Sequence, residues 1–326
     1  MKIFFKKILI FSFLPLVILL LFDFWLRGQD SIYEKKYEGL LSAKDSVQLL
    51  ILGNSHATYG VDPTAFSTIY AYNLANVSQT IYFDKRLTLK AIHEGVHKLK
   101  YVLISIDYHS FYTESQQHRD YWSWYGHGIE YKEKSYLLPA ISPFLWGYTP
   151  KVSFSLLSKS IRNNIRYAGE AIVHFNVEPD IDASAPLQQG FMTFTVTDDD
   201  SFNALSYRKR IERYREPAES KRAAVLNDLE DFIVQLQSSG ITPILFTTPT
   251  FHAYNQYLDS ATLHRNMNDI HRLSEKYGID HWDYMDDRRF TKEDFYNSDH
   301  LNKKGAVKFS KLLSERLDTL QLQRCR

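Results

Sequence analysis

Three short apolar runs constrain the fold of this chain more than any other feature of its sequence. They lie at residues 47–53, 101–106 and 243–248, and their length and composition are typical of buried β-strands. The sequence also predicts a weaker strand at 71–74 and helices at 82–99, 220–236, 258–277 and 303–320. Strands that alternate with helices imply right-handed crossovers and a parallel sheet covered on both faces.

The composition is that of an ordinary globular protein with nearly balanced charge. The 326 residues include 39 lysines and arginines and 38 aspartates and glutamates, which gives a net charge of +1. Nucleic-acid-binding proteins usually carry a basic excess, so this balance argues against a nucleic-acid partner. The single cysteine, Cys325, excludes a disulfide framework and a cysteine-based zinc site.

The N-terminus departs sharply from this average. Three lysines precede an almost unbroken apolar run at residues 8–22. A membrane-spanning helix needs about 20 residues, which residues 8–26 supply if Asp23 is tolerated near one interface. The positive-inside rule keeps the lysines in the cytoplasm. We therefore predict a single-pass signal-anchor at 1–28, a stalk at 29–46 and an extracytoplasmic domain at 47–326.

Two alternatives remain for the N-terminal segment. A cleaved signal peptide would end in a small-x-small site, and none follows the apolar run. A buried core helix of a soluble protein would show one polar face, and this segment has none.

Residues 109–217 break the alternation of strands and helices and are interpreted as a large aromatic-rich insertion. Tyr121, Trp122, Trp124 and Tyr125 have the flat apolar faces and polar edges that suit stacking on sugar rings. The alternative is that these rings form the core of the insertion.

Two motifs carry candidate chemistry. The first apolar run leads into Gly53-Asn54-Ser55, and His300 lies in a polar segment immediately before the last predicted helix. Open parallel sheets place their sites at the carboxyl ends of the strands. A serine there can act as a nucleophile if a base takes its proton, and His300 is the candidate base. His56, next to Ser55, either lines the pocket or is structural.

These motifs resemble those of the SGNH (GDSL-type) hydrolase superfamily. The resemblance implies a flavodoxin-like three-layer α/β/α fold with a mostly parallel sheet, here with an added transmembrane helix and insertion. It implies Ser55 as nucleophile and His300 as base. Its second block corresponds to residues 73–79, which makes Asn76, Ser78 and Gln79 candidates, with Asn54, for binding the oxyanion or substrate.

The chain departs from the family pattern at two places. The family has Asp three residues before the histidine, and this chain has Asn297. Asp299 or Asp294 could orient His300 instead, or a Ser–His dyad could suffice. In the third block Asp107 follows the strand where the family pattern continues to an oxyanion asparagine, so Asp107 becomes a candidate substrate contact.

The resulting prediction is a serine-dependent acyl ester hydrolase or O-acyltransferase, with O-acetyl as the expected group. Its substrate would be an acylated cell-surface glycan or a small ester, and the reaction needs neither metal nor cofactor. The alternative is a catalytically impaired SGNH-fold protein that serves as a binding or assembly partner of an integral-membrane O-acyltransferase.

Overall fold

The structure is a computed structural model that describes residues 2–29, 31–147, 187–212 and 219–324. Residues 148–186 and 213–217 of the predicted insertion, together with Ala218 and Cys325, lie outside the described residues. The chain divides into two compact units. We name them the N-terminal unit (Met1–Lys35 and Gln117–Pro186) and the sheet unit (Lys36–Gln116 and Leu187–Arg326).

The sheet unit contains five parallel strands in the order β2-β1-β3-β4-β5. This is the flavodoxin-like strand order, in which the chain reverses direction across the sheet after β2. The strands are β1 (Leu49–Leu52), β2 (Ala71–Asn73), β3 (Tyr101–Ser105), β4 (Thr242–Thr247) and β5 (Asp280–Asp283).

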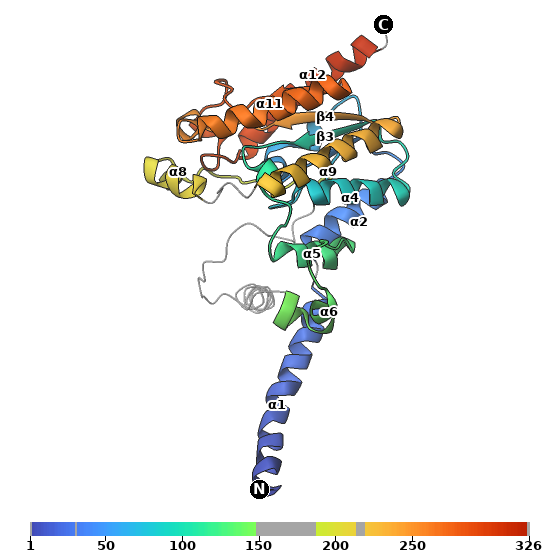
Figure 1. The fold of residues 1–326 in the computed structure, drawn as a ribbon, viewed down its shortest axis with the longest axis vertical. Coiled ribbons are helices and arrows are strands. Elements are labelled where there is room, and N and C mark those ends of the chain that lie inside the picture. The colour runs from blue at the N-terminus through green and yellow to red at the C-terminus, as the bar shows by residue number, and fades with distance from the viewer. Residues whose placement is uncertain (1, 30, 148–186, 213–218, 325–326) are drawn as a thin grey trace, which may run out of the picture. The chain divides into compact units, whose positions relative to one another are not determined.

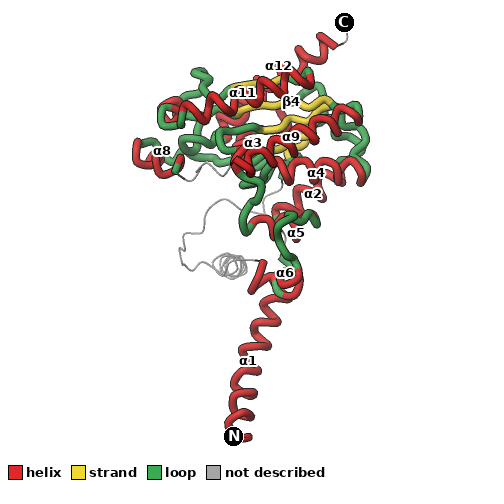
Figure 2. Tube along the Cα trace, in the orientation of Figure 1, coloured by secondary structure: helices red, strands yellow, loops and turns green. Residues whose placement is uncertain are grey.

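Helices cover both sides of these strands (Figures 1 and 2). Helix α9 contacts both α4 and α11, whereas α3 contacts α12. Right-handed crossovers place these two groups on opposite faces of the sheet, so the predicted three-layer α/β fold is confirmed. The helices are α3 (Ser55–Gly60), α4 (Ile81–His93), α9 (Glu219–Ser238), α11 (Ser260–Tyr277) and α12 (Lys303–Arg324).

The central strands are buried on both faces, which explains why they read as continuous apolar runs. Every residue of β1 and β3 is buried. On the α12 face, Leu49 and Ile51 of β1 belong to the same apolar cluster as Phe309 of α12. The edge strand β5 was not predicted, because its sequence is Asp-His-Trp-Asp and only Trp282 is buried.

Helix α2 (Ile32–Ser42) occupies much of the segment predicted to be a stalk. Within the sheet unit, the fully buried ammonium group of Lys36 donates to the carbonyl of Ala75. Tyr72 donates its hydroxyl to the carbonyl of Lys36 at 2.7 Å. Residues 36–42 therefore belong to the packed body of the sheet unit.

The N-terminal unit contains one long apolar helix, α1 (Lys2–Arg27), of 26 residues. Among the described residues it is long and apolar enough to cross a membrane. The described residues of this unit also form three shorter elements: α5 (Arg119–His127), α6 (Leu137–Ile141) and the π-helical turn η3 (Pro143–Gly147).

The predicted aromatic cluster lies on α5 of the N-terminal unit. Trp122 is buried, and Trp124 contacts the ring of Tyr136 with centroids 5.1 Å apart. Tyr125 donates its hydroxyl to the carbonyl of Pro139 at 2.7 Å. These contacts are packing within the unit, and stacking on sugar rings stays a prediction.

Short elements complete the sheet unit. They are η1 (Pro63–Ala65), η2 (Ser110–Tyr112), η4 (Asp199–Ser201), α8 (Ala204–Ile211), α10 (His252–Asn255) and η5 (Lys292–Asp294).

Candidate active site

The turn after β1 presents Ser55 at the carboxyl edge of the sheet. Gly53 has φ +131°, and a Cβ atom there would lie 2.5 Å from the Cβ of Ser105. Only glycine fits this close approach of two strands. Asn54 then caps α3, its Oδ1 accepting from the backbone N–H of His56 at 2.9 Å. Ser55 is the first residue of the helix.

Ser55 and His300 lie in direct contact although 245 residues separate them. The distance from Ser55 Oγ to His300 Nε2 is 2.8 Å. The side chain of His300 is 12% exposed, so the pair is shielded but reachable from solvent. The two motifs that the sequence singled out are therefore brought together by the fold.

The other ring nitrogen of His300 faces two acceptors. Nδ1 lies 3.0 Å from Asn297 Oδ1 and 3.1 Å from Asp299 Oδ1. Asn297 Oδ1 also accepts from the backbone N–H groups of His300 and Asp299, which identifies it as the amide oxygen. A proton on Nδ1 satisfies these acceptors and leaves the lone pair of Nε2 directed at Ser55.

Of the aspartates considered from the sequence, only Asp299 among the described contacts lies against His300. Its carboxylate is fully buried and also forms an ion pair with Arg210 of α8, at 2.9 Å. Asp294 instead accepts from the backbone of Thr291 and pairs with Lys308. The structure thus separates the two candidates that sequence reasoning left open.

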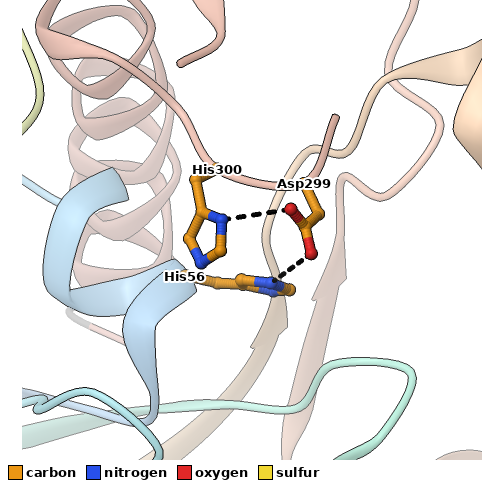
Figure 3. Close-up of side chains that lie close together, drawn as sticks. All are labelled: His56, Asp299 and His300. Atoms are coloured by element: carbon orange, nitrogen blue, oxygen red, sulfur yellow. Dashed lines mark ion pairs between the residues drawn. The ribbon is translucent and has the colours of Figure 1, made fainter. Parts of the chain in front are cut away.

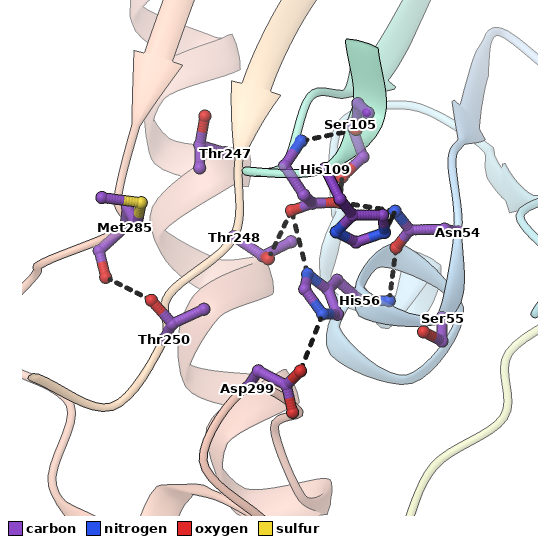
Figure 4. Close-up of polar contacts among 12 residues, drawn as sticks. Asn54, Ser55, His56, Ser105, His109, Thr247, Thr248, Thr250, Met285 and Asp299 are labelled. Carbon is purple, nitrogen blue, oxygen red and sulfur yellow. Dashed lines mark hydrogen bonds and ion pairs between the residues drawn. The ribbon is translucent and has the colours of Figure 1, made fainter. Parts of the chain in front are cut away.

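His56 forms a second buried bridge in the same cluster. Its Nδ1 lies 3.1 Å from Asp107 Oδ1 and its Nε2 lies 3.6 Å from Asp299 Oδ2. Figure 3 shows Asp299 beside both histidine rings with an ion pair marked to each, and Figure 4 shows His56 between Asp299 and the end of β3. A series of titratable side chains in contact therefore runs from Asp107 through His56 and Asp299 to His300.

The pKa values of His56 and His300 are shifted in opposite directions. Burial alone would lower the pKa of His56, but the carboxylates of Asp107 and Asp299 outweigh it and raise the pKa to about 10. Burial lowers the pKa of His300 below 6.5, against the opposing effect of Asp299. At neutral pH His56 is therefore an imidazolium, and His300 is neutral and able to accept a proton.

The cluster could hold a metal only by giving up these contacts. Ligand atoms of His56, Asp299 and His300 lie within 4.8 Å of one another. A cation there would have to displace the proton from His56, and it would compete with Ser55 for Nε2 of His300. The donor set suits proton transfer better than metal binding.

Asn54 and Asp107, two of the candidates for binding the oxyanion or substrate, form hydrogen bonds within a buried polar network. Asn54 Nδ2 donates to Asp107 Oδ2 at 2.9 Å and lies 3.1 Å from Nε2 of His109. Asp107 also accepts from the hydroxyls of Ser105 and Thr248, each at 3.0 Å (Figure 4). Both side chains thus serve to hold the turn and the ends of the strands together.

The second-block candidates lie beside this network. The amide of Asn76 donates to Gln79 Oε1, and Gln79 Nε2 donates to Asp84 Oδ1. Asp84 also accepts from the backbone N–H of Gly53, at 3.2 Å. Ser78 is exposed with φ +61°. Their roles toward a substrate stay predictions.

An aromatic group surrounds His300, and part of it comes from the segment predicted to be an insertion. Phe194 stacks on Tyr296 with centroids 3.8 Å apart, and it contacts Tyr59 of α3. The carbonyl of Phe194 accepts from the backbone of Lys303 at 2.7 Å. Neither Phe194 nor Arg210 was predicted, since nothing in the local sequence indicates that these residues return to the sheet.

Cavities do not by themselves indicate this site. A cavity of about 680 Å³ lies by Gln48 and Tyr70, which precede β1 and β2 and so mark the amino edge of the sheet. A pocket of about 10 Å³ lies beside His56 and His109, enough space for about one water. In parallel sheets the functional edge is the carboxyl edge, so the larger cavity is the weaker candidate.

Comparison with known proteins does not assign a family. No family model and no curated protein matches the chain. Among solved structures, a candidate acylhydrolase from Bacteroides fragilis NCTC 9343 is similar at 9% identity, over 90% of this chain and 99% of that chain, with a TM-score of 0.41. We draw nothing about activity from a likeness this distant.

Proposed function

We propose that the protein is an SGNH-type serine acyl ester hydrolase or O-acyltransferase. The observation that carries the proposal is the 2.8 Å contact of Ser55 Oγ with His300 Nε2. It is supported by the acceptors behind Nδ1, which favour the tautomer that a general base needs.

In the first half-reaction Ser55 Oγ attacks the carbonyl carbon of an ester, and its proton passes to Nε2 of His300. The tetrahedral intermediate then collapses, the C–O bond to the leaving alcohol breaks, and His300 returns the proton to the departing oxygen. The product is an acyl ester of Ser55. Water as the second nucleophile completes hydrolysis, and a sugar hydroxyl completes transfer.

The backbone N–H of Ser55 is the proposed oxyanion donor. As the first residue of a helix, Ser55 has no carbonyl four residues earlier in the helix to accept from its N–H. A fixed donor aimed at developing negative charge contributes a factor of about 10² to 10³ in turnover.

Asp299 supplies the carboxylate that SGNH hydrolases have three residues before the catalytic histidine, where this chain has Asn297. Its carboxylate stabilises the imidazolium that forms on His300, while Asn297 holds the ring in the required tautomer. Charge and orientation, which one aspartate usually supplies, are divided here between two side chains.

The proposed substrate is an O-acetylated glycan at a cell surface, and the proposed location is the cytoplasmic membrane with the sheet unit outside. Helix α1 is about 39 Å long at 1.5 Å per residue, enough to cross a hydrocarbon core of about 30 Å. Lys2, Lys6 and Lys7 favour a cytoplasmic N-terminus.

Activity is tested with the full chain in detergent and a small acetyl ester as probe. Ser55→Ala and His300→Ala should each reduce kcat at least 10³-fold, with unchanged circular dichroism. Ser238→Ala, on the exposed face of α9, is the matched control and should retain full activity.

A fluorophosphonate probe separates the enzyme from the alternative function. Labelling of the intact chain that is lost in Ser55→Ala is expected for an activated serine. An unlabelled, inactive wild-type chain would favour the assembly partner of a membrane O-acyltransferase instead.

The single cysteine tests the topology. A membrane-impermeant maleimide should label Cys325 in intact expressing cells. A Lys7→Cys variant in a Cys325→Ser background should react only after the membrane is opened. The reverse pattern would place the sheet unit in the cytoplasm and contradict the proposed location.

A further inference from the structure

A group of apolar side chains in the N-terminal unit is exposed without a partner among the described residues. Helix α6 and η3 follow each other within residues 137–147 and carry no charged side chain. Their exposed apolar residues, with 44 to 71% of each side chain accessible, form what we name the apolar collar: Leu137, Leu138, Ile141, Leu145 and Trp146. Contiguous exposed apolar patches on soluble proteins usually mark an interaction site.

The collar is fastened to the C-terminal end of α1 by a polar clasp. Asp23 Oδ1 accepts from Ser142 Oγ at 2.8 Å and from the backbone N–H of Phe144 at 3.1 Å. Arg27, paired with Asp23 at 3.0 Å, donates to the carbonyl of Ile141 at 2.6 Å. Figure 1 shows α6 beside this end of α1. The level of the collar along α1 is therefore fixed.

The position of the apolar collar along α1 coincides with the outer membrane–water interface of the proposed membrane span. Residues 8–22 rise only about 22 Å, less than the hydrocarbon thickness of about 30 Å. The rest of the span must include Asp23, whose side chain is only 12% exposed and is held by the clasp. Trp25 belongs to α1 and Trp146 to η3, which contact each other, and tryptophan is enriched at membrane interfaces.

We propose that the apolar collar is embedded in the outer leaflet of the bilayer, beside α1, as an interfacial membrane element. This inference rests on the proposed membrane anchoring of α1. Because the segment has no charge, the lipid chemistry it fits is the acyl and glycerol region rather than an anionic headgroup. Continuity with the apolar surface of α1 identifies lipid as the occupant.

The test measures depth in the membrane, because α1 alone would hold the chain on a bilayer. In a Cys325→Ser background, single cysteines replace Leu138, Ile141 and Leu145 and carry a nitroxide spin label. The full chain is reconstituted into nanodiscs of phosphatidylcholine only. Collisions with oxygen, which concentrates in lipid, are compared with collisions with a nickel chelate, which stays in water.

Two reference positions calibrate the result. Leu14→Cys lies within α1 and is exposed, and Leu322→Cys is an exposed leucine of α12 in the sheet unit. We expect a ratio of oxygen to nickel accessibility at the three collar sites several-fold above that at Leu322 and approaching that at Leu14.

Other outcomes would overturn the inference in distinguishable ways. Water-like ratios at the collar with a lipid-like ratio at Leu14 would reject the collar and leave the anchor intact. Water-like ratios at Leu14 as well would reject the anchor itself. Protection of the collar from both reagents would mean that protein covers it, and lipid would then be the wrong occupant.

Discussion

Each unit of the molecule contains a buried aspartate paired with an arginine, and the two pairs are built differently. Asp23 pairs with Arg27 one turn away and accepts from a serine hydroxyl and a backbone N–H. Asp299 instead contacts two imidazoles and an arginine from a distant segment. The first set of partners contains no imidazole, whereas the second contains two.

We propose that this difference separates a structural carboxylate, Asp23, from a functional one, Asp299. A carboxylate among fixed donors, such as Asp23, holds two segments of the chain together. A carboxylate in contact with two histidines, such as Asp299, couples the protonation of one ring to the protonation of the other.

Asp299→Asn should lower kcat about 10³- to 10⁴-fold, because an amide cannot stabilise the imidazolium of His300. Asn297→Asp is the matched control, since it keeps the acceptor oxygen and should stay within about tenfold of wild type. Steady-state kinetics on an acetyl ester measure both. Equal effects of the two substitutions would remove Asp299 from the proposed role.

The decrease of kcat/KM at low pH should reflect the protonation of His300. Neutral His300 is the active form, so kcat/KM should fall as pH drops through the pKa of His300, which burial holds below 6.5. The positive charge of His56 also lowers this pKa. His56→Gln should therefore move this decrease to higher pH, and a decrease that does not move would show that the two rings are uncoupled.

His56 should also make the stability of the fold depend on pH. Its pKa, lowered by burial but raised more strongly by Asp107 and Asp299, is about 10 when folded against 6.5 in the unfolded chain. Its stabilising contribution is complete below pH 6.5 and is lost as pH rises toward 10. The free energy of unfolding should fall by at most about 1.4 kcal/mol per pH unit.

Denaturant unfolding of the full chain in detergent at several pH values measures this slope. His56→Gln should flatten it in the range between pH 6.5 and 10. An unchanged slope in that variant would assign the pH dependence to other groups.

The smallest effect on activity is expected at the other aspartate. Asp23→Asn should leave kcat and KM unchanged while weakening the clasp by about 1 to 3 kcal/mol. Spin-label mobility at Leu145 would rise as a result. A loss of esterase activity in this variant would contradict the division between the two aspartates.

The sequence predicts the central strands well, because a strand buried on both faces must be continuously apolar. The predicted range 101–106 extends one residue beyond β3, and the predicted range 243–248 is shifted by one residue from β4. The predicted helix at 82–99 ends sooner, at His93, because Gly95 turns the chain at φ +112°. The edge strand β5 escaped prediction because it has only one buried apolar side chain.

Candidate site residues could be predicted when they belong to a local sequence motif. Residues that reach the site from distant segments could not. Ser55 and His300 each follow a recognisable pattern, and the fold places them together. Arg210 and Phe194 reach the site from the segment between β3 and β4, where the sequence has no regular period. The bridging position of His56 depends on two carboxylates that converge only after folding.

Asp299 and His300 are neighbours on one loop, whereas Ser55 belongs to the turn after β1. If the loop moves as a body, the acid and the base keep their separation while the gap to the serine opens or closes. The distance that changes is then the 2.8 Å contact between Ser55 Oγ and His300 Nε2. A displacement of about 1 Å in this contact costs about 100-fold in rate, so a ligand or crosslink that shifts this loop is expected to lower activity without contacting Ser55.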